Sequence, residues 1–495
     1  MCGITGALDF AGVISADVMA ARVEAMTRQI AHRGPDADGV RVIGACGLGH
    51  RRLAIIDLNP RASQPMSTAD ERLWVVFNGE IYNFPALRTE LEAAGCAFRT
   101  TSDTEVLLHG WRVWGEAMIA RLRGMFAFAL WDDRDQTLVL ARDRFGKKPL
   151  YYHADNAHFL FSSEIKSMLT WPGFDRRVDL SVIHDYMTFH YCIGEESAFA
   201  GVRKVPPAHY MIVRRDRPIR LERYWELAAI DPRNGARSHA DLARELVERL
   251  DDAVACRLIA DVPLGAFLSG GVDSSAVVAR MAILSSQPVK TFSVGFDIPG
   301  FDETPYALKV AQRYETDHHA FTMGYGLVAE LPRLIWHYGE PYADSSALVT
   351  FALAREIRKH VTVALTGDGG DEIFLGYSRY LRFKTFVERW RAGVRPRLPY
   401  EPVLPGEPTL LRDHYGRWIG SFREEHKQGG YGPALAEHLL TTSIDRLGLG
   451  LEAATSDDAM DIAARTEVGG YLPDDLNVKA DIATMAVALE GRSPF

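Results

Sequence analysis

The stretch VPLGAFLSGGVDSSAVVARMAILSS, residues 262–286, joins a short apolar run to a helical pattern through a loop rich in glycine and serine. We expect a buried strand at 262–269 and a helix at 274–286. Backbone N–H groups and hydroxyls gathered at the start of a helix bind anions, so the loop is a candidate phosphate site. It lacks the Gly-Lys-Ser/Thr of a Walker A loop, so ordinary γ-phosphoryl transfer is not expected. A serine-rich turn without a ligand is the alternative interpretation.

Strands and helices alternate on both sides of that loop. Strands are predicted at 291–296 and 361–367, a helix at 304–314, and an amphipathic helix at 238–259 with Ser238 as its N-cap. Such alternation is typical of a doubly wound parallel sheet.

A second loop of glycines and acids, LTGDGGDEIF at 365–374, also follows an apolar strand. Ligands bind at the carboxyl ends of parallel strands, so we expect both loops to face one crevice. Carboxylate oxygens are ligands that Mg²⁺ prefers. The candidate Mg²⁺ ligands are Asp273 in the first loop and Asp368, Asp371 and Glu372 in the second. An ordinary acidic turn is the alternative.

Residues 1–215 follow another pattern, in which Gly, Asn and Asp punctuate short β-prone runs. A proline-marked stretch at 201–227 separates the two halves, and we place the domain junction at 215–238. Strands are predicted at 47–58, 73–84, 125–132 and 138–146, and helices at 16–33 and 84–95.

The whole sequence has 495 residues and a formal net charge of −9. These values fit two or three domains and argue against broad binding to nucleic acids or anionic membranes. The five cysteines are scattered without CxxC spacing, which fits a reducing, cytoplasmic setting without zinc or disulfides. We expect neither a secretory signal nor a membrane span. The pair His318–His319 is interpreted as a strand start rather than a metal site.

The N-terminus, MCGI, places a thiol at position 2. Initiator methionine is normally removed before such a small residue, which would leave Cys2 with a free α-amino group. That amine has an ordinary pKa of about 7.7–8.0 and the thiol one of about 8.5, so the amine can serve as base for its own thiol. Cys2 is therefore a candidate N-terminal nucleophile. A buried small residue that happens to be second is the alternative.

Other polar residues of the same half could complete a site around Cys2. Arg52 lies in an apolar strand, where a guanidinium suits a bidentate grip on a carboxylate. Asn78 and Gly79 come at the end of the strand WVVF, and the Asn78 amide with the Gly79 N–H could form an oxyanion hole. Asp103 could accept a substrate ammonium. Taken singly, Asn-Gly is more typical of a hairpin turn, and Asp103 of a helix N-cap.

Together these motifs resemble the glutaminase domain of the N-terminal-nucleophile (class II, purF-type) amidotransferases. The resemblance covers about residues 1–215 and rests on MCGI, HRGPD, HRRLAIIDL, FNGEIYN, TSDTE, LRGMFAFALWD, ARDRFGKKPLYY and FSSEIK, in that order. HRGPD alone would suggest a surface loop. The resemblance implies that Cys2 attacks the carboxamide of glutamine and that Asn78 and Gly79 stabilise the oxyanion. The implied glutamine contacts are Arg52, Leu53, Ala54, Ile55 and Ile56 for the α-carboxylate, Asn78 and Gly79, and Glu80 and Asp103 for the α-ammonium.

The second half resembles the synthetase domain of glutamine-hydrolysing asparagine synthetases, which share a pyrophosphate loop with other ATP pyrophosphatases. The motifs are SGGVDSS, GEPYADSSAL at 339–348, LTGDGGDE and the tail YLPDDLNVKADIATMAVALEGRSPF at 471–495. The resemblance places Asp368 near the adenylated acceptor and Lys479 beside the leaving pyrophosphate, although a lone lysine is usually solvated. The implied ATP contacts are Leu268, Ser269, Gly270, Gly271, Asp273, Ser274, Ser275, Val294, Thr366 and Gly367.

The resemblance implies an α+β N-terminal-nucleophile (αββα sandwich) glutaminase domain at 2–215. An α/β doubly wound parallel-sheet synthetase domain at 238–495 would follow, with mostly helical additions at 381–470. The implied reaction is glutamine-dependent asparagine synthesis from glutamine, aspartate and ATP with Mg²⁺, with an internal channel for ammonia. Homodimers are common in the family, whereas nucleic-acid and membrane partners are not expected. Members usually continue beyond ArgSerProPhe, so we expect a synthetase domain truncated at its C-terminus.

Two other functions stay open on the sequence. A related enzyme could amidate another carboxylate, such as a sugar acid of a surface polysaccharide or a secondary metabolite. The other possibility is a glutaminase-like binding or regulatory protein with an inactive synthetase half.

Overall fold

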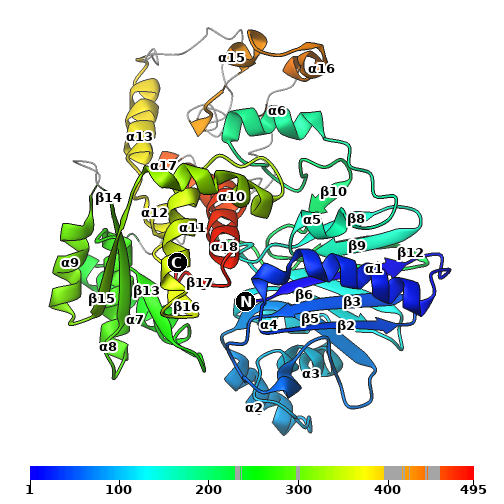
Figure 1. Ribbon diagram of the computed structural model, residues 1–495. Helices are drawn as coiled ribbons and strands as arrows, with labels where there is room; N and C mark the ends of the chain where they lie inside the picture. The colour runs from blue at the N-terminus through cyan, green and yellow to red at the C-terminus, as the bar shows by residue number, and fades with distance from the viewer. Residues whose placement is uncertain are drawn as a thin grey trace.

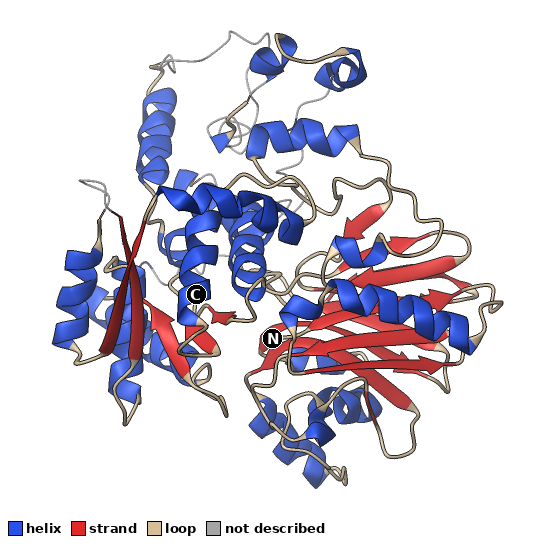
Figure 2. Cartoon of the chain, in the orientation of Figure 1, coloured by secondary structure: helices blue, strands red, loops and turns tan. Residues whose placement is uncertain are grey.

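A computed structural model describes residues 1–228, 235, 237–296, 302–394, 415, 419–422, 424–440, 443 and 458–495. Two antiparallel six-stranded sheets with their helices form one half, and a five-stranded parallel sheet with its helices forms the other (Figures 1 and 2). Across these described residues, no helix is both long and apolar enough to cross a membrane.

The two antiparallel sheets pack face to face and bury a shared apolar core that includes Ile4, Val76, Trp131 and Phe161. Alternate residues of a strand point to opposite faces, and β6 is buried along almost its whole length because helices cover its other face. The first sheet has the order β10-β8-β9-β1-β3-β2: β1 (Gly3–Asp9), β2 (Ala37–Ile43), β3 (Cys46–Arg52), β8 (Tyr151–Ala154), β9 (His158–Ser162) and β10 (Val202–Lys204). The second has the order β12-β11-β7-β6-β5-β4: β4 (Met66–Ser67), β5 (Leu73–Ile81), β6 (Gly124–Asp132), β7 (Thr137–Arg142), β11 (His209–Arg214) and β12 (Arg217–Arg223).

Helices cover the outer face of each antiparallel sheet. Met19 and Val23 of one helix pack on the first sheet, and Leu91 and Leu107 of two others pack on the second. The layers are therefore helix, sheet, sheet, helix, which confirms the expected αββα sandwich. The helices of this half are α1 (Ala16–Gln29), η1 (Ala31–Arg33), η2 (Pro60–Ala62), α2 (Phe84–Ala93), α3 (Glu105–Trp114), α4 (Ala117–Arg121), α5 (Ile165–Met168) and α6 (Leu180–Phe189).

The parallel sheet has the order β15-β14-β13-β16-β17, and apolar clusters lie on both of its faces. The strand order reverses between β13 and β16, which defines the switch point at which doubly wound sheets bind ligands. The strands are β13 (Leu264–Phe267), β14 (Lys290–Phe296), β15 (Asp317–Met323), β16 (Val363–Leu365) and β17 (Glu490–Arg492). The covering helices are α7 (His239–Ala255), α8 (Val272–Leu284), α9 (Thr304–Arg313), η4 (Tyr325–Glu330), α10 (Leu331–Tyr338) and α11 (Ser346–Ile357).

Most predicted elements match the observed ones to within a few residues. The Ser238 hydroxyl accepts a hydrogen bond from the Asp241 N–H, which confirms the N-cap of α7. His318 and His319 are the second and third residues of β15, as the prediction of a strand start requires. Within 381–470, helices occupy most of the described positions, while residues 229–234 and 236 of the predicted junction and much of 381–470 lie outside the described residues. The remaining helices are α12 (Gly370–Phe374), α13 (Ser378–Arg391), α15 (Glu424–Gln428), α16 (Pro433–Ala436), η5 (Glu437–Leu440), α17 (Ala459–Thr466), the π-helix η7 (Glu467–Leu476) and α18 (Asn477–Met485).

Candidate active sites

A small pocket of about 30 Å³ lies at the start of β1, where Cys2 directly precedes the strand. Met1 is 1% exposed and packs against Leu53 and Met125, and its ammonium forms a buried ion pair with Glu490. Met1 therefore fills space beside Cys2, and its removal would enlarge the pocket. The wall consists of Met1, Cys2, Arg52, Leu53, Ile55, Ile56, Ala62, Gln64, Phe77, Gly79, Glu80, Ser102, Asp103 and Thr104.

Asn78 lies directly behind this wall and holds the backbone of Cys2. The Cys2 N–H donates to Asn78 Oδ1 at 3.0 Å, while Asn78 Nδ2 is buried and has no hydrogen-bond partner in the part of the chain that is described. A buried amide without a partner is costly, so this donor is set to meet an acceptor that the ligand-free protein lacks.

The Asn-Gly pair is not the hairpin turn that its sequence suggests when taken singly. β5 continues through it to Ile81, so the expectation that Asn78 and Gly79 end the strand was wrong, whereas the longer strand predicted at 73–84 is confirmed as far as Ile81. Gly79 has φ 148°, and a Cβ there would come within 2.0 Å of the Met125 carbonyl oxygen. The close approach of β6 therefore requires glycine at this position.

The charged residues predicted for glutamine surround the same pocket. Arg52 is the last residue of β3, so the strand is shorter than the predicted 47–58. The Arg52 guanidinium donates to the carbonyls of Asp57 and Asn59 in the loop that follows. Asp103 does not cap α3: its carboxylate instead accepts from the Ile81 N–H at 2.9 Å. Burial is the main reason that the pKa of Asp103 is raised to about 6.

Ala54 is outside the wall of this pocket. Its N–H donates to the Asp36 carboxylate at 2.8 Å. Burial raises the pKa of the Cys2 thiol, and the N-terminal ammonium and Arg52 oppose that effect.

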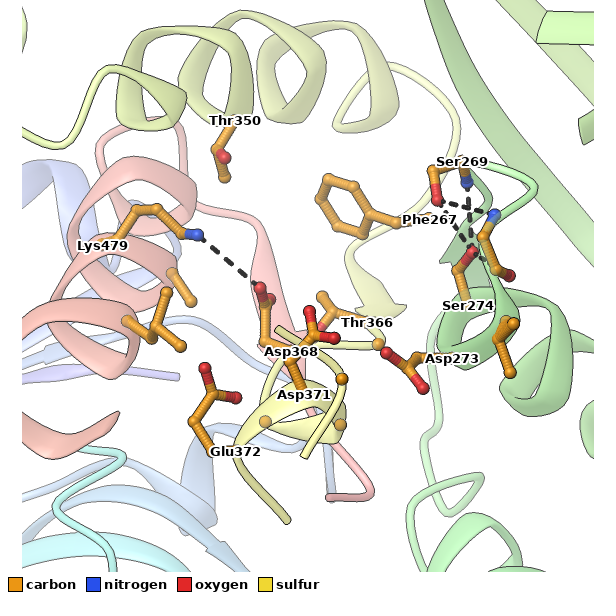
Figure 3. A pocket seen from close by; sticks show the side chains of 18 of the residues that line it. Phe267, Ser269, Asp273, Ser274, Thr350, Thr366, Asp368, Asp371, Glu372 and Lys479 are labelled. Atoms are coloured by element: carbon orange, nitrogen blue, oxygen red, sulfur yellow. Dashed lines mark hydrogen bonds and ion pairs between the residues drawn. The ribbon is translucent and has the colours of Figure 1, made fainter. Parts of the chain in front are cut away.

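The second site is a cavity of about 700 Å³ at the switch point, between the loops that follow β13 and β16 (Figure 3). The expectation that both loops face one crevice is met. The predicted residues in its wall are Ser269, Gly271, Asp273, Ser274, Thr366, Gly367, Asp368, Asp371, Glu372 and Lys479. Four predicted ATP residues lie outside the wall: Leu268, Gly270, Ser275 and Val294.

Three of these exceptions have local reasons. Leu268 is 1% exposed and packs in the apolar core beneath the loop. The Ser275 hydroxyl is buried on α8 and has no partner among the described residues. Gly270 has φ +87°, a conformation that favours glycine, and packs against the backbone of Tyr306.

Carboxylates gather on one side of the cavity. Asp273, Asp368 and Asp371 point into it (Figure 3). Burial, and then the charge of Asp371, raise the pKa of Asp273. Two carboxylates that repel each other fit a divalent cation such as Mg²⁺ between them. The donor set therefore suits Mg²⁺, and Asp273 and Asp371 remain its predicted ligands.

Lys479 is the basic side chain among the described residues of this wall. It is 8% exposed, which excludes the solvated lysine expected for a lone residue, and its Nζ lies 3.8 Å from both Asp344 and Asp368. Burial opposes its charge, but the two carboxylates outweigh burial and raise the pKa of Lys479. Its ammonium therefore stays charged at neutral pH.

Glu372, a predicted residue of the second wall, is fully buried, accepts from the Tyr377 hydroxyl at 2.6 Å and leaves its other oxygen without a partner among the described residues. Sequence reasoning missed other residues in or beside this wall. Asp344 lies within a quoted motif but was given no role; its carboxylate also accepts from the Ser346 N–H at 2.8 Å, just before α11. Thr350 and Tyr377 had no pattern that could single them out.

Buried ion pairs join the two halves. Arg33 is completely buried, although Pro35 and Asp36 of the same HRGPD motif are exposed, and its Nε donates to the Cys2 carbonyl at 3.0 Å. The same guanidinium contacts Glu164 at 2.9 Å and Asp481 of α18 at 2.7 Å. Lys148 also contacts Asp481, at 3.1 Å. The wall of the first site thus depends on residues from both ends of the chain.

An N-terminal-nucleophile fold followed by a parallel sheet with a phosphate loop defines a two-domain glutamine amidotransferase. Residues 1–225 match the family described as glutamine amidotransferase domain, and residues 245–495 match the family described as asparagine synthase. The chain belongs to the asparagine synthetase family of glutamine-hydrolysing ligases.

Three relatives illustrate the range of that family. The chain is 36% identical to asparagine synthetase [glutamine-hydrolyzing] 1 of Bacillus subtilis, over 100% of this chain and 79% of that protein. It is 34% identical to a putative asparagine synthetase [glutamine-hydrolyzing] of Mycobacterium tuberculosis, over 100% of this chain and 80% of that protein. It is also 35% identical to amidase chyE of Penicillium rubens, over 77% of this chain and 60% of that protein.

Proposed function

We propose that this protein makes asparagine from aspartate, using glutamine as nitrogen donor and ATP to activate the acceptor. The observation that carries the proposal is the presence, in one chain, of a Cys2 pocket with an unpartnered amide donor and a phosphate-loop cavity with a buried lysine. The relatives named as asparagine synthetases support aspartate as the acceptor.

In the first pocket, the Cys2 thiol gives its proton to the α-amine exposed by loss of Met1, and the sulfur attacks the glutamine carboxamide. The oxyanion would accept from Asn78 Nδ2 and the Gly79 N–H. Its collapse breaks the C–N bond, and the proton leaves with ammonia. Water then cleaves the thioester and releases glutamate. Arg52 would hold the α-carboxylate of glutamine, and Glu80 and Asp103 its α-ammonium.

In the second cavity, a carboxylate oxygen of the acceptor attacks the α-phosphorus of ATP and displaces pyrophosphate. The acyl adenylate is a good electrophile, and ammonia displaces AMP from it to form the amide. Donors from Ser269 to Ser274 would bind the phosphates at the start of α8. Mg²⁺ held by Asp273 and Asp371 would offset phosphate charge. Lys479 would neutralise charge on the leaving pyrophosphate.

One assay tests the proposal. The protein is given glutamine, ATP and Mg²⁺ with and without aspartate, and glutamate, pyrophosphate and asparagine are measured. We expect asparagine and pyrophosphate in equal amounts only when aspartate is present. Pyrophosphate without asparagine would refute aspartate as acceptor, and glutamate alone would refute the synthetase activity.

The relative named as an amidase favours a second candidate, the amidation of another carboxylate by the same two sites. A panel of amino acids and sugar acids in the same assay distinguishes it. Cys2→Ala is the internal control: it should abolish use of glutamine while asparagine still forms from added ammonium. Loss of both activities would contradict two separate sites.

A further inference from the structure

Arg492 contacts one wall residue of each pocket. Its Nη2 lies 3.2 Å from Glu80 Oε1, in the wall of the Cys2 pocket. Its backbone carbonyl accepts from the Thr366 N–H at 2.9 Å, in the wall of the second cavity. The next residue also contacts the wall of the second cavity: the Ser493 hydroxyl donates to the backbone carbonyl of Asp368.

The guanidinium is held firmly everywhere except at Glu80. The side chain is fully buried, its Nη1 donates to the carbonyls of Arg257 and Ile259, and its Nε donates to Glu490 at 2.6 Å. Nη2 makes no hydrogen bond to any described residue, so its contact with Glu80 is an ion pair without hydrogen-bond alignment. A change in the charge around Glu80 would therefore act on Nη2, the nitrogen that is least firmly held in the otherwise fixed Arg492 guanidinium.

The positive charge near Glu80 does not fully offset the effects that disfavour its ionised carboxylate. Burial, and then the charge of Glu490, raise the pKa of Glu80, and Arg492 only partly opposes them. Arg492 is shared between two carboxylates, and Glu490 has the better-aligned contact. A substrate ammonium beside Glu80 would stabilise the Glu80 carboxylate. It would thereby change how strongly that carboxylate attracts the Arg492 guanidinium.

We propose that Arg492 couples the two pockets, so that occupancy of the glutamine site at Glu80 changes the affinity of the second cavity for nucleotide through β17 and Thr366. This inference rests on the proposed function for the identity of the two ligands. Arg492 is a positioning residue, because it touches wall residues and not the substrates. β17 pairs with β16, whose end leads directly into Thr366, so the path is one residue long.

Coupling of this kind is reciprocal: nucleotide must change glutamine affinity by the same factor as glutamine changes nucleotide affinity. Typical couplings between two sites are about 5- to 150-fold. A residue that only supported the fold would weaken either ligand without changing that factor, so the factor is the diagnostic quantity.

The experiment measures binding by calorimetry in the full chain carrying Cys2→Ala, which binds glutamine without hydrolysing it. The nucleotide is α,β-methylene-ATP with Mg²⁺, whose bridging carbon prevents release of pyrophosphate. The dissociation constant of glutamine is determined with and without nucleotide, and the reverse titration checks reciprocity. Arg492→Met is then added. Arg142→Met is the matched control, because Arg142 is equally buried and donates to the carbonyls of Lys148, Val205 and Gly146 within the first half.

We expect a factor of about fivefold or more in the parent and the Arg142→Met protein, and a factor near one in Arg492→Met. An unchanged factor in Arg492→Met overturns the inference. If Arg492→Met does not fold, Arg492→Lys decides, since lysine keeps one charge but cannot span both carboxylates. Its factor should fall at least twofold, and a factor equal to the parent's overturns the inference. A parent that binds both ligands with a factor of one refutes the coupling alone, whereas a parent that binds no glutamine refutes the proposed function with it.

Discussion

Removing the side chain of Asn78 should reduce glutamine hydrolysis far more than it reduces stability. Asn78 Oδ1 accepts the Cys2 N–H at 3.0 Å, and its Nδ2 has no partner among the described residues. Loss of an oxyanion donor costs about 2.7–4 kcal/mol in the transition state, or roughly 10²–10³ in kcat. In the folded protein, Asn78→Ala loses one hydrogen bond of about 1 kcal/mol but also removes a buried donor whose isolation costs about 1–3 kcal/mol. These two effects oppose each other, so the free energy of unfolding should change little.

The assay is glutamate release at saturating glutamine, with ammonium-dependent amide formation measured on the same preparation. We expect the first rate to fall about 10²- to 10³-fold while the second continues. Asn83→Ala is the matched control, because the Asn83 side chain bonds only to Arg121 and Arg123 at a surface turn. A glutamate-release rate for Asn78→Ala within about threefold of the parent would show that the unpartnered amide is not an oxyanion donor.

Three further predictions follow from single contacts. Asp103 has its pKa raised to about 6, mainly by burial, so it loses its charge as pH falls below that value. The KM for glutamine should therefore rise about fivefold between pH 6 and pH 5, and a pH-independent KM over that range would contradict a role in ammonium binding. Lys479→Met should reduce acceptor-dependent pyrophosphate release about 10²-fold while glutamate release continues, and equal pyrophosphate rates would exclude Lys479 from that step. Ser238→Ala should lower the free energy of unfolding of the second half by about 1 kcal/mol in a urea titration, because the N-cap of α7 loses its acceptor; an unchanged transition would mean that the cap contributes nothing.

The sequence predicted the parts of both sites that local pattern governs. The phosphate loop could be recognised because glycines and serines between an apolar run and a helical pattern commonly form an anion-binding loop at a helix N-terminus. The meeting of the two loops followed from the rule for parallel strands, and β13 and β16 do pair side by side. Cys2, Arg52, Gly79 and Asp103 could be grouped through motifs alone.

Residues whose role depends on distant chain could not be predicted in this way. Arg33 looks like part of a polar turn, yet Glu164 and Asp481, far along the sequence, bury it completely. Asn-Gly favours a turn by itself, but pairing of β5 with β6 keeps it in a strand. Asp344 and Lys479 are 135 residues apart in number, and only the packing of α11 on α18 brings their charges to 3.8 Å.

The segment from α18 to β17 shows why the two sites should not behave as independent modules. Lys479 and Asp481 are two positions apart on one helix, so they face different sides: Lys479 enters the second cavity, and Asp481 holds the Arg33 that binds the Cys2 carbonyl. β17 repeats this division, with Glu490 at the N-terminal ammonium and the Arg492 carbonyl on Thr366. Buried ion pairs are costly to break on one side only. A shift of this segment that improved one site would therefore disturb charges already fixed at the other, which links the geometry of the Cys2 pocket to the geometry of the second cavity.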